Sequence, residues 1–149
     1  MKINFEKINY TLPEDYLKFL QANPDGSEVC FDEYDEPDED YDGRNWVLMS
    51  IDELNESWEM KGVGMAENYN CLNLYVKCYQ EFSGSKVIES NEGSLPVNRV
   101  TNGFVIGSEN GDYLYLDPQD RFSVWIYYHD GSDVLKVSNS FSQWLGKTK

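Results

Sequence analysis

The C-terminal third of the chain constrains the fold most, because its apolar residues alternate with polar ones and clear turn signals separate the runs. Asn110-Gly111 is a dipeptide favoured in two-residue β-hairpin turns, and residues 118–120 and Asp130-Gly131 also have turn composition. The runs between these turns are residues 103–109, 112–117, 122–129 and 134–138. The pattern predicts a meander of four antiparallel strands.

Three segments carry capping boxes, the residue pairs that begin many helices. The pairs are Thr11 with Glu14, Ser50 with Glu53, and Ser140 with Gln143. The first predicts a helix from about Leu12 to Ala22, ended by the turn at residues 23–26. The second predicts a helix ending near Gly62, and the third a short terminal helix whose apolar face packs on the sheet.

The remaining segments give shorter or weaker patterns. Residues 28–31 and 46–49 predict two short strands. Residues 72–78 alternate and favour a strand, although the same stretch also fits a helix flanked by Glu67 and Gln80. Together the patterns predict an α+β fold. We expect a single domain over residues 1–149, with an antiparallel sheet packed against about three helices.

The chain is strongly acidic, with 27 acidic and 12 basic side chains and a formal net charge of −15. Eight of the carboxylates lie in residues 32–42, DEYDEPDEDYD, which we call the acidic run. Such a charge repels nucleic acids and anionic membranes and favours a basic protein partner, with association speeded by electrostatic steering. Solubility alone is the alternative explanation for the charge.

The N-terminal residues and the cysteines indicate the compartment. No apolar stretch near the start is long enough for a signal sequence, so we expect a soluble, cytoplasmic protein. Cys30, Cys71 and Cys78 are odd in number and lack metal-ligand spacing. We expect three buried free thiols.

Several of these segments also match the pattern of a known family. They are the Leu-Pro-x-x-Tyr-x-x-Phe-Leu motif of residues 12–20, Trp46, the helix start at residues 50–54, the hairpin of residues 103–117, and the Ser-Phe-x-x-Trp-Leu segment of residues 140–145. In order and spacing the chain resembles the SUKH superfamily, which contains fungal cell-wall synthesis regulators and many bacterial immunity proteins. It departs from that pattern in having no helix before Leu12 and in replacing an Asn-Gly-Gly turn with residues 23–26. The resemblance implies an α+β domain that binds a toxin domain and performs no catalysis.

A calcium site is the first chemical alternative for the acidic run. Asp38, Asp40 and Asp42 followed by Gly43 match the first six positions of an EF-hand loop. The match fails at position twelve, where Met49 replaces the bidentate carboxylate, and no EF-hand helices flank the loop. We expect no dedicated metal site, with a weak, adventitious divalent-ion site as the alternative.

Catalytic and cofactor motifs are missing from the sequence. His129 is the only histidine, and no nucleophile elbow, phosphate-binding loop or dinucleotide fingerprint occurs. We therefore expect neither catalytic residues nor a cofactor, and we interpret the chain as a binding protein.

The candidate partner-binding residues are the carboxylates of the acidic run and aromatic residues of the predicted strands. They are Asp32, Glu33, Asp35, Glu36, Asp38, Glu39, Asp40, Asp42, Trp46, Tyr113, Tyr115, Trp125 and Tyr127. Aromatic residues rimmed by carboxylates would form an interface anchor, and core packing is their alternative role. A second acidic group follows the turns, for which turn chemistry is the simpler explanation: Glu109, Asp112, Asp117, Asp120, Asp130 and Asp133.

Three functions remain open at this point. The favoured one is a bacterial immunity protein of a polymorphic or contact-dependent toxin system, which binds and neutralises a basic toxin domain, plausibly a nuclease. The second is a regulatory or scaffold module similar to the fungal members of the family. The third is a calcium-responsive module. The sequence does not indicate the oligomeric state.

Overall fold

The computed structural model describes residues 5–34 and 43–149. Its main sheet is built from β1 (Ser27–Phe31), β2 (Arg44–Leu48), β5 (Val87–Ser90), β6 (Gly93–Pro96), β7 (Phe104–Glu109), β8 (Asp112–Asp117), β9 (Ser123–Tyr128) and β10 (Asp133–Ser138). These eight strands follow the order β1-β2-β7-β8-β9-β10-β5-β6, and only the β10–β5 pair is parallel. A separate hairpin consists of β3 (Ser57–Met60) and β4 (Gly64–Glu67).

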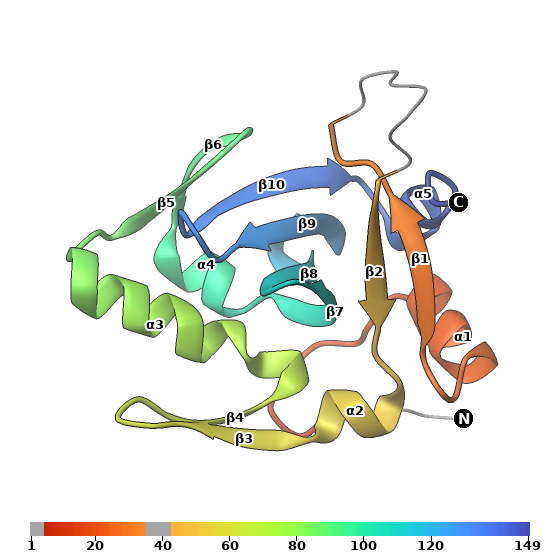
Figure 1. Ribbon diagram of the computed structural model, residues 1–149, viewed down its shortest axis with the longest axis horizontal. Helices are drawn as coiled ribbons and strands as arrows, with labels where there is room; N and C mark the ends of the chain where they lie inside the picture. The colour runs from red at the N-terminus through yellow and green to blue at the C-terminus, as the bar shows by residue number, and fades with distance from the viewer. Residues whose placement is uncertain (1–4, 35–42) are drawn as a thin grey trace.

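Five α-helices and two 3₁₀ turns complete the described part of the chain. They are α1 (Glu14–Ala22), α2 (Ile51–Asn55), α3 (Leu72–Ser83), α4 (Val97–Thr101) and α5 (Phe141–Leu145), with η1 (Asn68–Asn70) and η2 (Pro118–Asp120). The predicted α+β class is confirmed, with more strands and helices than we expected (Figure 1).

The C-terminal meander is confirmed, since β7, β8, β9 and β10 pair consecutively and antiparallel. At the first turn Glu109 pairs with Asp112, and Asn110 and Gly111 have φ values of 46° and 91°. Positive φ at both central residues is what a type I′ turn requires, so local chemistry closes this hairpin.

The three predicted helix starts are correct in position, but their caps differ. Ser50 and Glu53 form the complete capping box, whereas Ser140 accepts only the Gln143 N–H. At α1 the capping box is wrong, because Pro13 is the N-cap residue and no side chain caps the helix.

The predicted extension of the second helix to Gly62 is wrong, because α2 ends at Asn55 and the chain turns into β3. The Asn68 side chain donates to the Glu53 carbonyl at 2.7 Å and accepts the Trp58 indole N–H at 3.0 Å. These bonds tie the β3–β4 hairpin to the end of α2.

The strand favoured for residues 72–78 is also wrong, because this stretch forms most of helix α3. Leu72, Val76 and Tyr79 repeat at helical spacing, and all three pack against the core. Gly84 ends the helix in the left-handed conformation, with φ of 71°.

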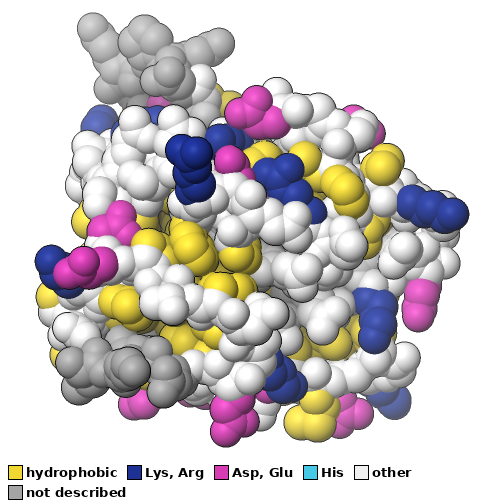
Figure 2. Space-filling view, turned by 180° about the vertical axis from the view of Figure 1, so that it is seen from behind, with side chains coloured by type: hydrophobic (Ala, Val, Ile, Leu, Met, Phe, Trp, Pro, Cys, Tyr) yellow, Lys and Arg dark blue, Asp and Glu magenta, His cyan; other side chains and the backbone are white. Residues whose placement is uncertain are grey.

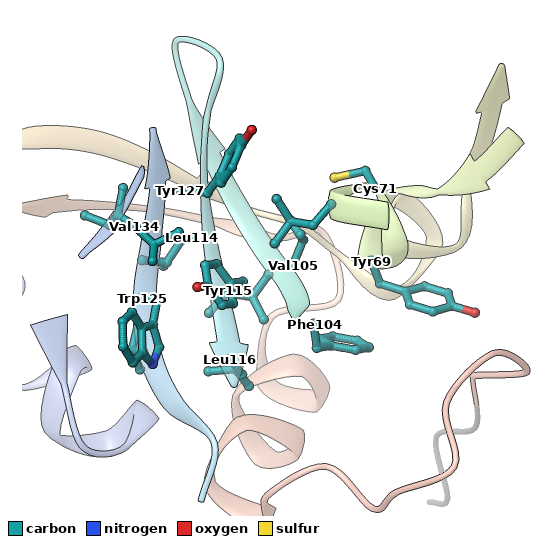
Figure 3. Packing of buried hydrophobic residues seen from close by; sticks show 14 of the residues in the cluster. Tyr69, Cys71, Phe104, Val105, Leu114, Tyr115, Leu116, Trp125, Tyr127 and Val134 are labelled. Atoms are coloured by element: carbon teal, nitrogen blue, oxygen red, sulfur yellow. The ribbon is translucent and has the colours of Figure 1, made fainter. Parts of the chain in front are cut away.

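Helices cover both faces of the central strands. On one face Tyr113 donates a hydrogen bond to Tyr75 of α3 at 3.0 Å, and the Trp125 ring lies 5.6 Å from the guanidinium carbon of Arg99 in α4. On the other face Phe104 of β7 meets the Tyr16 ring of α1 at 6.1 Å. Figure 3 shows how closely the side chains of β7 to β10 pack in this core. The central strands are therefore buried on both sides, and their aromatic residues are core residues.

Among the described residues, no helix is both long enough and apolar enough to cross a lipid bilayer.

Gly43, where the chain re-enters the sheet, tests the steric control of this region. It has φ of +109°, and a Cβ there would lie 2.2 Å from the Phe31 carbonyl carbon. Gly93 has nearly the same φ, +105°, but has open space around it. Because a clash with backbone adds to the conformational strain, we expect Gly43→Ala to lower the free energy of unfolding by about 2–4 kcal/mol and Gly93→Ala by about 1 kcal/mol. Urea denaturation measures both, and equal losses would contradict the steric explanation.

Candidate functional site

A group of charged side chains gathers at the end of the sheet where β1 ends and β2 begins. Arg44 Nε lies 3.0 Å from Glu33 Oε1, and Arg44 Nη1 lies 2.5 Å from Glu109 Oε2 and 2.8 Å from Asp112 Oδ2. Asp112 Oδ1 in turn lies 2.7 Å from His129 Nδ1. We call these five residues the Arg44 cluster.

Strand pairing brings the cluster together. Glu109 and Asp112 are partners across the β7–β8 turn, Glu33 follows β1 by two residues, and Arg44 begins β2, which pairs with both β1 and β7. The guanidinium carbon of Arg44 also lies 4.7 Å from the centre of the Trp46 ring, which is fully buried. One face of the guanidinium therefore packs on an aromatic ring, and its edge binds carboxylates.

Burial makes the charges of the cluster interdependent. The Glu33 side chain is 0% exposed, and its second carboxylate oxygen accepts the Tyr128 hydroxyl. Burial would lower the pKa of the Arg44 guanidinium, but the hydrogen bond to Asp112 and the charges of Glu33 and Glu109 outweigh it, so that pKa is raised. Burial, together with the hydrogen bond to Glu33, raises the pKa of Tyr128. Glu33 is thus an internal ion-pair residue.

Asp112 and His129 shift one another's titration. Burial alone would raise the pKa of the Asp112 carboxyl, but hydrogen bonds from the His129 backbone, Arg44 and the His129 ring lower it. The hydrogen bond to Asp112 raises the pKa of His129, with a further contribution from Asp130, whose carboxylate lies 3.1 Å from His129 Nε2. Gly111 lies beneath the imidazole, where an added Cβ would come within 3.0 Å of the ring.

The structure describes two of the eight carboxylates of the acidic run. Asp32 is half-buried and accepts the Tyr34 N–H at 3.0 Å, and Glu33 is buried in the Arg44 cluster, so its predicted role as a free partner contact is wrong. The other six, and with them the aspartates of the EF-hand-like pattern, lie outside the described residues: Asp35, Glu36, Asp38, Glu39, Asp40 and Asp42.

The predicted aromatic anchors are inside the molecule. Trp46, Tyr115, Trp125 and Tyr127 have 0%, 1%, 1% and 2% of their surface exposed, and half-buried Tyr113 bonds to α3. A side chain without exposed surface cannot touch a partner of the folded protein. The prediction that these four anchor an interface is therefore wrong, because the folded protein buries them in its core.

The carboxylates of the turns divide between the two ends of the meander. Glu109, Asp112 and Asp130 lie at the Arg44 end. At the other end Asp117 binds Arg99 at 2.8 Å and Asp120 binds Lys136 at 2.7 Å. Turn chemistry explains Asp117 in part, since it also accepts the Gln119 N–H.

Sequence reasoning missed Arg44, on which the cluster depends. The available signal was its position, since it is the first basic residue after eight carboxylates. Its partners Glu109 and Asp112 are 65 and 68 residues away, and only the strand order places them beside it.

Residues 5–34 and 43–149 give no sign of a metal centre. They contain no group of three or more His, Cys, Asp and Glu side chains placed to hold a metal ion. Cys71 is buried, and burial raises its pKa to about 12. The expectation of three buried thiols is wrong for exposed Cys78 and half-buried Cys30.

The described structure is thus that of an α+β protein with a mostly antiparallel, helix-covered sheet and a charged cluster at one end of it. The sequence profile of the SMI1 / KNR4 family (SUKH-1) matches residues 5–147, and the chain belongs to this family. Searches among curated proteins and among solved structures found no match. The resemblance seen in the sequence is confirmed.

The Arg44 cluster predicts that Arg44 is essential for stability. Arg44→Met keeps the apolar stem but leaves three carboxylates, two of them on the buried residues Glu33 and Asp112, without their counter-charge. We expect the free energy of unfolding at neutral pH to fall by about 3–5 kcal/mol, the cost of an uncompensated buried charge.

Lys18→Met is the matched control, because it removes a cation from the 3.2 Å pair with Glu14, in which both side chains are over 70% exposed. Exposed pairs of this kind contribute about 0.5 kcal/mol. Equal losses for the two variants in chemical denaturation would show that the Arg44 cluster is not structural.

The Asp112–His129 contact predicts a shifted histidine titration. Because the pKa of His129 is raised from 6.5, its contribution to stability is complete below that pH and is lost as the pH rises through the folded-state pKa. We expect NMR titration to give a midpoint above 6.5 for the wild type and a lower midpoint for Asp112→Asn. Asp133→Asn, which removes the same charge from an exposed neighbour, serves as the control. Equal midpoints for wild type and Asp112→Asn would refute the assignment.

Proposed function

We propose that this chain is an immunity protein that binds and neutralises a basic toxin domain, with the Arg44 end of the sheet and the acidic run as its contact surface. Family membership supports a role in protein recognition, and the net charge of −15 favours a basic partner. Binding takes place in the cytoplasm of the cell to be protected and requires neither catalysis nor a cofactor.

The observation that carries the proposal is the pairing of Arg44 with more carboxylates than its single positive charge can neutralise. This guanidinium is held by three carboxylates, so the cluster retains an excess of negative charge beside the start of the acidic run. Asp130, whose side chain is 93% exposed, adds a further carboxylate at this end. Arg44, the nearest described cation, is already paired with these carboxylates. It therefore would not repel the Lys or Arg side chains of a partner that approaches this surface.

Tyr34 supplies an exposed aromatic side chain within the acidic run. It is 64% exposed and directly follows Glu33, which anchors this part of the chain to Arg44. A tyrosine in this position suits a desolvated contact within a polar interface, the role that the buried strand aromatics cannot fill.

The proposed mechanism is electrostatic and steric. The carboxylates would occupy the Lys/Arg groove with which a nuclease holds a phosphate backbone, so that substrate is excluded. Seen from behind, Lys and Arg side chains lie next to Asp and Glu side chains at several places on the described surface (Figure 2). A surface that presents both signs of charge is a poorer contact for a basic groove than the acidic Arg44 end of the sheet.

Charge-neutralising variants test the contact surface. We expect conversion of Asp38, Glu39, Asp40 and Asp42 to amides to slow association about tenfold or more at low salt and to flatten its salt dependence, because electrostatic steering is lost. The measurement is stopped-flow association with the toxin domain, identified as the product of the adjacent upstream gene.

The control converts four exposed carboxylates around α1, α2 and β3 to amides, with the same change in net charge: Asp25, Asp52, Glu56 and Glu59. If both sets slow association equally, only net charge matters. If the upstream gene product neither co-purifies with the protein nor is neutralised by it in growing cells, the immunity function is wrong.

A regulatory scaffold is the second candidate, because the matching family takes its name from SMI1 and KNR4 and the resemblance includes fungal regulators. Such a module would use the same acidic surface to recruit a basic segment of a signalling protein. Genome context separates the two candidates, since a neighbouring gene for a large secreted protein with a toxic C-terminus favours immunity.

A further inference from the structure

A second surface, far from the Arg44 cluster, combines cations with a hollow. The space between α3, β5, β6 and α4 has a volume of about 400 Å³, within the range of small-molecule sites. These elements lie on the opposite side of the molecule from β1 and β2 (Figure 1). The hollow is lined by Asn73, Lys77, Gln80, Lys86, Pro96, Val97, Asn98 and Thr101.

The lining has the opposite charge to the rest of the chain. It contains two lysines and no carboxylate, in a protein with 27 acidic and 12 basic residues. Most other described basic residues have carboxylate partners, including Lys7, Lys18 and Lys136. The side chains of Lys77 and Lys86 have no carboxylate partner and no hydrogen bond among the described residues.

The fold holds these donors around one space. Asn73, Lys77 and Gln80 are spaced i, i+4, i+7 and therefore share one face of α3. Lys86 is fixed opposite α4, because its carbonyl accepts the Val97 N–H at 3.2 Å. Buried Val97 forms part of the floor.

The polar groups define the ligand chemistry. Within the described part of the chain, the side-chain amides of Asn73, Gln80 and Asn98 have no hydrogen-bond partner. Together with the two lysines, these residues give five side chains in the lining of the hollow that can donate hydrogen bonds to a ligand. The Thr101 hydroxyl donates to the Asn98 carbonyl at 2.8 Å and is left as an acceptor. Lysines bind phosphate as point charges, and amide N–H groups complete such a site.

We propose that this hollow binds a small ligand carrying phosphate groups, with Lys77 and Lys86 as the charged contacts. The site is independent of the toxin-binding proposal. Its position away from the acidic run removes it from the strongest repulsion that an anion meets on this protein.

NMR titration of the full chain with inorganic diphosphate tests the site. At constant ionic strength we expect saturable shifts of amides in α3, at residue 86 and in α4. Loss of two charge-assisted contacts in Lys77→Gln/Lys86→Gln should weaken binding about tenfold or more. A parallel titration with ADP separates recognition of phosphate alone from recognition that includes an organic group.

Lys18→Gln/Lys61→Gln is the control, because it removes the same charge from two exposed sites outside the hollow. It should bind like the wild type. The absence of saturable shifts in the wild type, or equal weakening by both double variants, would overturn the proposal. Because the four substituted lysines are exposed, we expect every variant to fold. The spectra recorded without ligand check this.

Discussion

The contact of one guanidinium with three carboxylates is the interaction on which this end of the structure depends. Glu33, Glu109 and Asp112 come from segments that would repel one another in a chain of net charge −15, and Arg44 lies within 3.0 Å of all three. Since the Glu33 side chain is entirely buried, its charge has no solvent to replace a lost partner. Arg44 thereby connects the end of β1, the start of β2 and the β7–β8 turn.

The same use of scarce cations appears at the opposite end of the meander. Arg99 lies against Trp125 and binds buried Asp117, and Lys136 of β10 binds Asp120, which also accepts the Ser123 hydroxyl. Basic residues thus hold together the strand ends, where turns place acidic side chains. Because acidic side chains outnumber basic ones by 27 to 12, the surface keeps a net negative field after these pairs have formed.

The parts of the fold that were predictable are those determined by local chemistry. Asn110 and Gly111 both adopt positive φ, and that preference sets the β7–β8 pairing next to the turn, where Glu109 is opposite Asp112. Residues 72–78 could not be assigned, because Leu72, Leu74 and Val76 are buried and satisfy a period of two as well as a helix. Their helical state depends on contacts made by residues outside the alternating set, such as Tyr75 with Tyr113. The Arg44 cluster was unpredictable for a related reason, since its members meet only after the sheet has ordered its strands.

Burial of the sheet also determines where recognition can occur. With α3 and α4 on one face of the central strands and α1 on the other, the aromatic residues of β7, β8 and β9 contact helices and are not available to a partner. At the Arg44 end, Glu33 near the start of the acidic run and Arg44 just after its end are joined at 3.0 Å. This pair joins the end of β1 to the start of β2 and removes Glu33 from the charges offered to a partner. Glu33, although part of the acidic run, therefore stabilises the fold through its ion pair with Arg44. The carboxylates proposed to contact a partner are the others of the run.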